Sequence, residues 1–333
     1  MSGNCYVGST VVSALLDAGD RVVGLDDLSR GHPAFLARTP HYVGDVADEP
    51  LLDRIFAEHP EIEIVIHCAA RTQVQESTAD PLRYYRTNVG KAVTLFERVV
   101  ANGCTRLVFS SSAAVYGDPV TPAVTEDSPV AAASPYAATK LMVERILDDL
   151  CAAGPVNALS LRYFNPIGAD PQLRSGSTDP APPHVLGRLI AASVAGEPFW
   201  IHGDDWDTPD GTPIRDFVHV ADVARAHVVA AHRWSAIAVG SRHQVINIGS
   251  GRPTTVRELA EAFNRVAARP VTIRTGGRRP GDTVGCYADT SKARRMLGWA
   301  PRHTLADGIR DALRWADELV GRGWAADPAV ELP

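Results

Sequence analysis

The feature that most constrains the fold is an alternation of two sequence patterns. From the start of the chain to about residue 165, short β-branched runs alternate with amphipathic stretches of helical length. Parallel strands need a crossover between them, and in right-handed β-α-β units a helix supplies it. We therefore predict an α/β fold with a doubly wound parallel sheet and helices on both faces. The strand-like runs are RVVGLDD, HYVGDV, EIVIHCAA, RLVFSSS and NALSLRYFNP.

After this region the pattern changes. A loop rich in Gly, Ser and Pro (GADPQLRSGSTDPAPP) is followed by helices and short strand-like runs such as QVINIGSG and PVTIRT. A chain of 333 residues is long enough for two lobes. We predict a dinucleotide-binding domain over residues 1–168 and a smaller α/β substrate lobe over 169–333, with some segments returning to the first domain.

Composition excludes several classes of function. The net charge is -6 and no basic stretch gathers the cations that phosphate backbones need, so we expect no nucleic-acid partner. No apolar run approaches about 20 residues and no signal-peptide pattern starts the chain, so we expect no membrane partner. The cysteines are odd in number and never spaced C-x-x-C, which predicts no disulfide framework, no metal site and a reducing, cytoplasmic location; they are Cys5, Cys68, Cys104, Cys151 and Cys286.

Polar or small residues follow the predicted strands, and ligands of parallel sheets bind at these carboxyl ends. Asp26 lies about 20 residues after the start of a glycine-bearing loop, where an acid holds the ribose hydroxyls of a dinucleotide and repels a 2′-phosphate. This favours NAD over NADP in a Rossmann-like domain. A second interpretation stays open, in which Asp26 and Asp27 only form a turn. Asp45 fits either an adenine contact or a turn, and Cys68–Ala70 fit either a flat cofactor or tight packing.

A second group of residues predicts proton transfer at the site. Tyr136 and Lys140 lie four residues apart on a predicted helix, so both side chains share one face and the ammonium can favour the phenolate. A tyrosine tuned in this way can take a proton from a sugar hydroxyl. Ser112 follows a predicted strand end on the same side of the sheet and can bridge the substrate hydroxyl and Tyr136.

Ser112, Tyr136 and Lys140 match the Ser and Tyr-x-x-x-Lys triad, and the chain resembles the extended short-chain dehydrogenase/reductase family, in particular its UDP-glucose 4-epimerases. The resemblance covers nearly the whole chain in the expected order. The matching stretches are LDDLSRG, VIHCAA, SSSAAVYG, SPYAATKLMVE, LRYFNPIGA, DGTPIRDFVHVADVA, INIGSG, RRPGD and YADTSKARRMLGW.

The resemblance implies an isomerase that inverts C4 of a UDP-hexose reversibly through a transient 4-keto sugar, with tightly bound NAD and a UDP-sugar substrate. It also implies a homodimer formed by helices around residues 82–102 and 136–152. The cofactor residues it implies, together with those above, are Gly3, Tyr6, Val7, Gly8, Asp26, Asp27, Asp45, Val46, Cys68, Ala69, Ala70, Asn88, Lys140 and Tyr163. The substrate residues are Ser112, Tyr136, Asn165, His184, Arg215, Arg279, Asp282 and Cys286, with the two arginines on the diphosphate.

Several positions depart from the family pattern. Thr72 stands where the family has a phosphate-binding lysine, and His184 in PPHVLG is displaced by one residue from the family's sugar contact, so a simple loop histidine is an equal alternative. Cys286 stands where a large tyrosine closes the pocket of glucose- and galactose-restricted members. The smaller side chain predicts that UDP-GlcNAc and UDP-GalNAc are interconverted as well.

Three other functions share parts of this pattern. A sugar 4,6-dehydratase needs an acidic pair beside the serine, and Ala113 and Ala114 occupy that place, which disfavours it. A pentose or uronic acid 4-epimerase stays open. So does a cofactor-poor, non-catalytic Rossmann protein that binds nucleotide sugars.

The opening stretch MSGNCYVGST departs most from the family's T-G-x-x-G-x-x-G loop. Gly8 keeps the third glycine, but Ser2 and Cys5 stand at the first two, with Gly3 between them. Their Cβ atoms would crowd the pyrophosphate turn. The first strand of the sheet is expected to be missing, either through truncation or a misplaced start, or as a natural variant, and NAD affinity is expected to suffer.

Overall fold

A four-stranded parallel sheet forms the centre of the molecule. The computed structural model describes residues 6–35, 37–179, 184–234, 242–279 and 283–324. The strand order is β11-β6-β4-β3, and the register aligns Val108 with Leu159 and Ser160 with Val245. The strands are apolar on both faces, as expected when helices cover both sides of a parallel sheet. They are β3 (Val65–His67), β4 (Arg106–Ser112), β6 (Asn157–Tyr163) and β11 (His243–Ile248).

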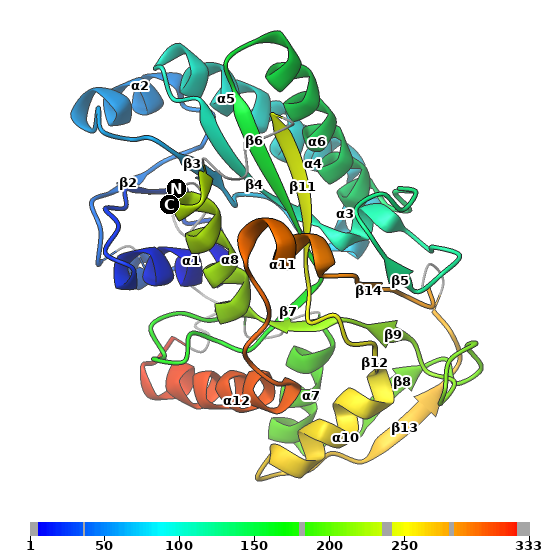
Figure 1. The fold of residues 1–333 in the computed structure, drawn as a ribbon. Helices are drawn as coiled ribbons and strands as arrows, with labels where there is room; N and C mark the ends of the chain where they lie inside the picture. Colours follow the sequence, from blue (N-terminus) through cyan, green and yellow to red (C-terminus); the bar gives the residue numbers. More distant parts are fainter. Residues whose placement is uncertain (1–5, 36, 180–183, 235–241, 280–282, 325–333) are drawn as a thin grey trace.

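Helices cover both faces of this sheet (Figure 1). On one face, apolar residues of α1 (Tyr6–Asp17), α8 (Val220–His232) and α11 (Ser291–Leu297) form one core with the strands. On the other, α2 (Glu49–Glu58), α5 (Lys91–Ala101) and α6 (Pro135–Ala153) form a second core. The predicted doubly wound parallel sheet is therefore confirmed. Shorter helical segments in the same half are η1 (Pro33–Phe35), α3 (Val74–Ala79), α4 (Pro81–Tyr84), the π-helical η2 (Tyr85–Gly90) and η3 (Ala113–Tyr116).

The sheet is interrupted between β3 and the two strands that come first in the chain. β1 (Gly24–Asp26) and β2 (His41–Val43) pair with each other in parallel and form a separate ladder. Among the described residues, no strand joins the ladder of β1 and β2 to β3.

Among the described residues, the second half of the chain together with β5 and β7 forms four two-stranded ladders below the sheet's carboxyl end (Figure 1). A third apolar core joins α7, α10 and α12 to these strands. In contrast, β11 is a strand of the first sheet and α8 packs in the core on one of its faces. The ladders pair β5 (Ala123–Val124) with β14 (Tyr287–Ala288), β7 (Asn165–Ile167) with β10 (Phe217–His219), β8 (Phe199–His202) with β13 (Ile273–Gly276), and β9 (Ile214–Arg215) with β12 (Thr254–Thr255). The helices are α7 (Val185–Ala195), α10 (Val256–Val266) and α12 (Leu305–Gly321).

Local sequence signals explain the helices that position the site. Ser134 caps α6 by accepting a hydrogen bond from the Ala137 amide, and Pro135 occupies the first helical position, where its missing N–H costs nothing. Thr255 and Glu258 form a reciprocal capping box at the start of α10. Within the described residues, none of the helices combines the length and apolar character needed to cross a bilayer.

Candidate active site

The structure brings Ser112, Tyr136 and Lys140 together at the carboxyl end of β4. Ser112 is the last residue of β4, and α6 begins next to it, so Tyr136 and Lys140 lie on the helix's first two turns and are buried. Lys140 Nζ donates a 2.8 Å hydrogen bond to the carbonyl oxygen of Ser110 and lies 6.0 Å from the centre of the Tyr136 ring. The lysine thus ties α6 to the strand end as well as lying beside the phenol.

The pKa of Tyr136 reflects its buried surroundings and its contact with Ser112. Burial raises the pKa of Tyr136, and a hydrogen bond with Ser112 partly offsets that rise. Ser112 Oγ also accepts a 3.2 Å hydrogen bond from the Ala114 amide, which fixes the hydroxyl at the start of η3. The hydrogen bond with Ser112 therefore favours the anion of Tyr136.

A buried polar network, which was not predicted from the sequence, supports the end of β4 where Ser112, Tyr136 and Lys140 lie. Glu144 lies two turns beyond Tyr136 on α6 and makes a two-pronged ion pair with Arg162 of β6, at 3.0 and 2.6 Å. Ser111 donates to the same carboxylate at 2.5 Å, and Arg162 also donates to the Tyr116 hydroxyl at 2.9 Å. Tyr116 in turn donates to Asn247 of β11 at 2.7 Å. The i, i+4 spacing from Lys140 to Glu144 is the only sequence signal for this network.

Two of the predicted cofactor residues have their polar groups engaged within the protein. The Asn88 amide pairs with both backbone groups of Arg71, at 2.8 and 3.0 Å, and donates to Thr139 at 3.0 Å. The Tyr163 hydroxyl contacts Ser110 Oγ at 2.9 Å and His227 Nε2 at 2.5 Å. In this structure both residues hold neighbouring loops and strands in position.

The predicted adenosine-side acids lie at the ends of β1 and β2. Asp26 is buried and accepts a 2.7 Å hydrogen bond from the Leu28 amide, whereas Asp27 is exposed and accepts from Ser29. Asp27 therefore matches the turn interpretation. Asp45 forms an ion pair with Lys91 and accepts from the Ala47 amide, while Val46 is buried in the core.

The remaining cofactor candidates also gather at this edge. Tyr6, Val7 and Gly8 form the first turn of α1, and the Tyr6 hydroxyl donates to the carbonyl oxygen of Gly168 at 2.7 Å. Cys68, which follows β3, accepts a 3.0 Å hydrogen bond from Ser110, and Ala69 and Ala70 are half-buried. Gly3 lies outside the described residues.

The predicted diphosphate contacts lie on β9 and after β13. Arg215 donates to the carbonyl oxygens of Ile214 and Val284, at 2.7 and 3.3 Å. Gly285 has a φ of +96°, and a Cβ there would lie 2.0 Å from the carbonyl oxygen of Ile214, so only glycine allows this approach. Arg279 donates to His202 at 2.5 Å. Asp282 lies outside the described residues.

The other sugar-side candidates are placed differently. Asn165 is exposed at the start of β7, while Cys286 is half-buried against a core that contains Tyr116 and Phe164. Burial raises the pKa of the Cys286 thiol to about 11, partly offset by Arg215. His184 caps α7 by accepting from the Gly187 amide at 3.1 Å, so its visible role is that of a helix cap.

Asp216, in the stretch IRDF, is a buried residue of this region that was not among the predicted site residues. Its carboxylate is fully buried and accepts from the amides of Ser250, Gly251 and Ala288 and from the Ser250 hydroxyl, at 2.6 to 3.0 Å. Burial raises the pKa of Asp216, and these bonds oppose the rise. It fastens the loop after β11 and strand β14 beside Arg215 and Cys286.

The donor set fits a dinucleotide more closely than a metal. A buried carboxylate follows β1, small side chains follow β3, a helix begins with Tyr6 to Gly8, and a phenol and an ammonium follow β4, all on one edge of the sheet. These are the groups that ribose hydroxyls, a flat ring and a pyrophosphate require. No cluster of three or more potential metal ligands occurs among the described residues.

Comparison with known proteins adds an independent observation. The model of the NAD dependent epimerase/dehydratase family matches residues 3–249. The UDP-glucose 4-epimerase of Azospirillum brasilense is 40% identical over 321 residues, which span 95% of this chain and 91% of the relative.

Solved structures are similar over the same extent. The UDP-glucose-4-epimerase of Stenotrophomonas maltophila, solved with NAD and formylated UDP-arabinopyranose, matches with a TM-score of 0.92 and 34% identity over 96% of this chain and 98% of that one. The UDP-Glc/GlcNAc 4-epimerase of Campylobacter jejuni matches with a TM-score of 0.82 and 32% identity, over 95% and 98% of the two chains.

Proposed function

The chain belongs to the NAD dependent epimerase/dehydratase family, and on that premise we propose that it interconverts UDP-glucose and UDP-galactose by inverting C4 of the sugar. The observation that carries this proposal is the grouping of Ser112, Tyr136 and Lys140 at the carboxyl end of β4. Relatives that carry this activity in their names cover more than nine tenths of the chain.

The chain's own residues supply the proton chemistry. Tyr136 Oη takes the proton of the sugar 4-hydroxyl as C4 is oxidised, and it returns the proton when the 4-keto sugar is reduced. Ser112 Oγ holds the phenol and the substrate hydroxyl in line, because it already hydrogen-bonds Tyr136. Lys140 keeps α6 against the end of β4 through its bond to the Ser110 carbonyl oxygen.

A bound NAD would supply the hydride acceptor for C4 and, in the second half of the reaction, the hydride donor to the opposite face of the same carbon. The residues that would hold it are the first turn of α1, Asp26, the small residues Cys68 to Ala70, and Lys140. Each turnover must regenerate the cofactor, so NAD has to stay bound while the sugar rotates in the site.

The sugar must turn over within the site, so binding energy is best concentrated on the UDP. Arg215 and Arg279 lie on the second half of the chain and offer guanidinium groups that match phosphate oxygens. Their present acceptors are carbonyl oxygens and a histidine, which a diphosphate would replace. Cys286 leaves more room beside the sugar than a tyrosine would, so UDP-GlcNAc and UDP-GalNAc are proposed as further substrates.

Two finer properties belong to the same proposal. A homodimer is expected through the helices of residues 82–102 and 136–152, on which Leu82 and Met142 are 62% and 44% exposed. Sizing in solution should give twice the mass of one chain, and a monomer would contradict this arrangement. A reducing, cytoplasmic location agrees with the described cysteines, which form no disulfide with one another: Cys68, Cys104, Cys151 and Cys286.

The test is direct conversion of substrate. Purified protein with added NAD should convert UDP-glucose to UDP-galactose, and proton NMR of the anomeric signals measures this conversion. NAD should also be recovered from the protein after denaturation. Conversion of only UDP-pentoses or UDP-uronic acids would overturn the proposed substrate. A protein that is inert towards all of these and holds no NAD would be a binding protein instead.

A further inference from the structure

Four buried side chains contact one another in series across the carboxyl ends of the central strands. His227 of α8 lies 2.5 Å from the hydroxyl of Tyr163, the last residue of β6. The same hydroxyl lies 2.9 Å from Ser110 Oγ of β4, which in turn lies 3.0 Å from the sulfur of Cys68, after β3. All four residues are at most 7% exposed. This series, which we call the His227 chain, connects a helix on one face of the sheet to three neighbouring strand ends.

The hydrogen bonds of His227 have a fixed direction. Its Nδ1 lies 3.0 Å from the carbonyl oxygen of Val223, and because a carbonyl oxygen only accepts, Nδ1 carries a hydrogen. Burial lowers the pKa of His227 to about 4, so the ring is neutral near pH 7 and Nε2 carries a lone pair instead of a hydrogen. The Tyr163 hydroxyl must therefore donate its hydrogen to Nε2.

This donation determines how the next hydroxyl points. A phenol has one hydrogen, so the Tyr163 oxygen can only accept from Ser110 once that hydrogen points to His227. The Ser110 hydroxyl lies between the Tyr163 oxygen and the Cys68 sulfur, and the oxygen is the stronger acceptor of the two. With no acceptor at position 227, the Tyr163 hydrogen could turn to Ser110 instead. His227 thus sets the direction of hydrogen bonding at Ser110.

Ser110 connects the His227 chain to the candidate active site through its backbone. Its carbonyl oxygen accepts the 2.8 Å hydrogen bond from Lys140 Nζ. The register of β3 with β4 ends at Phe109, so the contact between Ser110 and Cys68 extends this join one residue further. Because the side chain and the carbonyl belong to one residue near a strand end, loss of the side-chain contacts should also loosen the carbonyl that holds Lys140.

The surroundings of His227 explain why its contacts matter. The ring is fully buried, and Tyr163 belongs to the apolar core on this face of the sheet. An imidazole in such a core destabilises the fold unless its two nitrogens have partners, and here both have one. An apolar side chain of similar size could fill the same space without engaging Tyr163. The residues that α8 contributes to this core are Val223, Ala224, Ala226 and Ala230.

We propose that His227 is a positioning residue, which acts through Tyr163 and Ser110 to hold Lys140 at the end of β4. Its contribution is to keep a carbonyl acceptor in place for the lysine, and it takes no part in proton or hydride transfer. The kinetic consequence of this assignment rests on the proposed function, whereas the position of Lys140 does not.

A spectroscopic test reports on Lys140 without any catalysis. The chain has only three lysines, Lys91, Lys140 and Lys292, so NMR of lysine isotopically labelled at Cε gives signals that are easily assigned. Tyr163→Phe removes one atom of the His227 chain, and His227→Leu removes its final acceptor. Both variants should shift the Lys140 signal and leave the other two lysines unchanged. His227→Gln puts an amide oxygen near the place of Nε2, so it should restore most of the parent signal.

The kinetic test uses the same variants with UDP-glucose. His227→Leu should lower kcat about tenfold with little change in KM, because a displaced lysine disturbs alignment at the sugar and not the grip on the UDP. His227→Gln should stay within about threefold of the parent. The double variant His227→Leu with Tyr163→Phe should be no slower than the slower single variant, since both substitutions break the same series of contacts.

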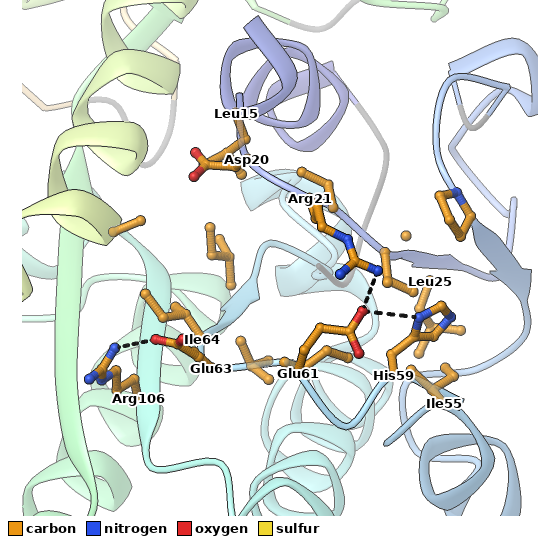
Figure 2. Close-up of a pocket in the computed structure, with 18 of the residues that line it drawn as sticks. Leu15, Asp20, Arg21, Leu25, Ile55, His59, Glu61, Glu63, Ile64 and Arg106 are labelled. Atoms are coloured by element: carbon orange, nitrogen blue, oxygen red, sulfur yellow. Dashed lines mark hydrogen bonds and ion pairs between the residues drawn. The ribbon is translucent and has the colours of Figure 1, made fainter. Parts of the chain in front are cut away.

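A matched control lies on the same helix. His232 ends α8 and pairs with Asp20 at 2.9 Å, and both residues line the cavity of about 810 Å³ between β1 and β3 (Figure 2). His232→Leu makes the same substitution outside the His227 chain. It should leave both kcat and the Lys140 signal as they are in the parent.

The Lys140 signal decides the inference. A signal that stays unchanged in both His227→Leu and Tyr163→Phe would overturn it, as would losses of kcat that add in the double variant. If His227→Leu does not fold, Tyr163→Phe still decides, because its Lys140 signal must shift. A parent chain that shows the expected shifts but does not convert UDP-glucose would contradict the proposed function and support the role of His227.

Discussion

Tyr136 is the residue on which the proposed chemistry depends most. Its hydroxyl is buried beside Ser112, and removal of that hydroxyl leaves no group in place to take the 4-hydroxyl proton. Tyr136→Phe should therefore lower kcat for UDP-glucose by about 10² to 10⁴ with NAD content unchanged. The rates are compared by NMR at saturating substrate.

A matched control shows whether such a loss is local. Tyr42 lies on β2, and its hydroxyl contacts Glu58 and His59 at the outer edge of the sheet. Tyr42→Phe removes the same atom and should leave kcat within a factor of two or so of the parent, since it bears on no step of the reaction. Near-normal turnover of Tyr136→Phe would show that another group is the base.

Ser112 should act through the pH dependence of the same step. Burial raises the pKa of Tyr136 and the hydrogen bond with Ser112 lowers it, so Ser112→Ala should raise this pKa further. Because the reaction needs the phenolate, the rising limb of the pH–rate profile should move to higher pH in the variant. If the maximal rate falls but the rising limb of the pH–rate profile stays at the same pH, Ser112 only positions the substrate.

Cys286 is predicted to control the width of the sugar pocket. Cys286→Tyr adds a ring beside Tyr116 and Phe164, so turnover of UDP-GlcNAc should fall at least tenfold while UDP-glucose is still converted. The ratio of kcat/KM for the two substrates is the readout, with Cys286→Ser as the control. A parent chain that does not act on UDP-GlcNAc would contradict the role of Cys286 at the outset.

At this scale the sequence predicted side chains that local spacing brings together, and it could not predict their partners. Tyr136 and Lys140 share a helix face because they are four residues apart. That Lys140 bonds the carbonyl of Ser110, or that the Asn88 amide is engaged by Arg71 and Thr139, depends on how distant segments pack. No local pattern carries that information.

Among the elements, the contact between α6 and β6 supports the end of β4 where Ser112, Tyr136 and Lys140 lie. Glu144 and Arg162 are 3% and 5% exposed, so loss of one partner leaves a buried charge unpaired. Glu144→Ala should lower the free energy of unfolding by about 3 to 5 kcal/mol, measured by chemical denaturation.

The double variant separates the charge from the packing. Glu144→Leu together with Arg162→Met removes both charges and keeps most of the volume, so it should be considerably more stable than Glu144→Ala. If the single and double variants are equally destabilised, the ion pair does not connect α6 to β6. The hydrogen bonds to Ser111 and Tyr116 would then be the contacts that connect them.

The longer elements were predictable because their periodicity is local. The strands β4, β6 and β11 appear in the sequence as apolar runs that end in polar residues, and Ser134-Pro135 marks the start of α6. Two-residue strands such as β9 and β12 have no such signal, because their pairing follows from the approach of two loops. Asp216, which fastens this region, was missed for the same reason.

For the whole molecule, the alternation of patterns predicted the parallel sheet and its two covered faces, and the polar residues after the strands indicated which edge would carry the site. The interruption between β1 and β3 is a property of the complete sheet, and its shape and lining became visible only in three dimensions. Ser112 ends β4, and α6 carries Tyr136 and Lys140 beside it, so the triad is supported by the continuous sheet of β3, β4, β6 and β11.

The central claim is that C4 is oxidised and reduced within one site. It is tested most directly with UDP-glucose that carries deuterium at C4, incubated with the protein and NAD in ordinary water. Because the hydride leaves C4 and returns to C4 without exchange with solvent, the UDP-galactose formed should retain the deuterium at C4. Product that has lost the label to water would contradict this account, because inversion would then proceed through a proton removed from carbon.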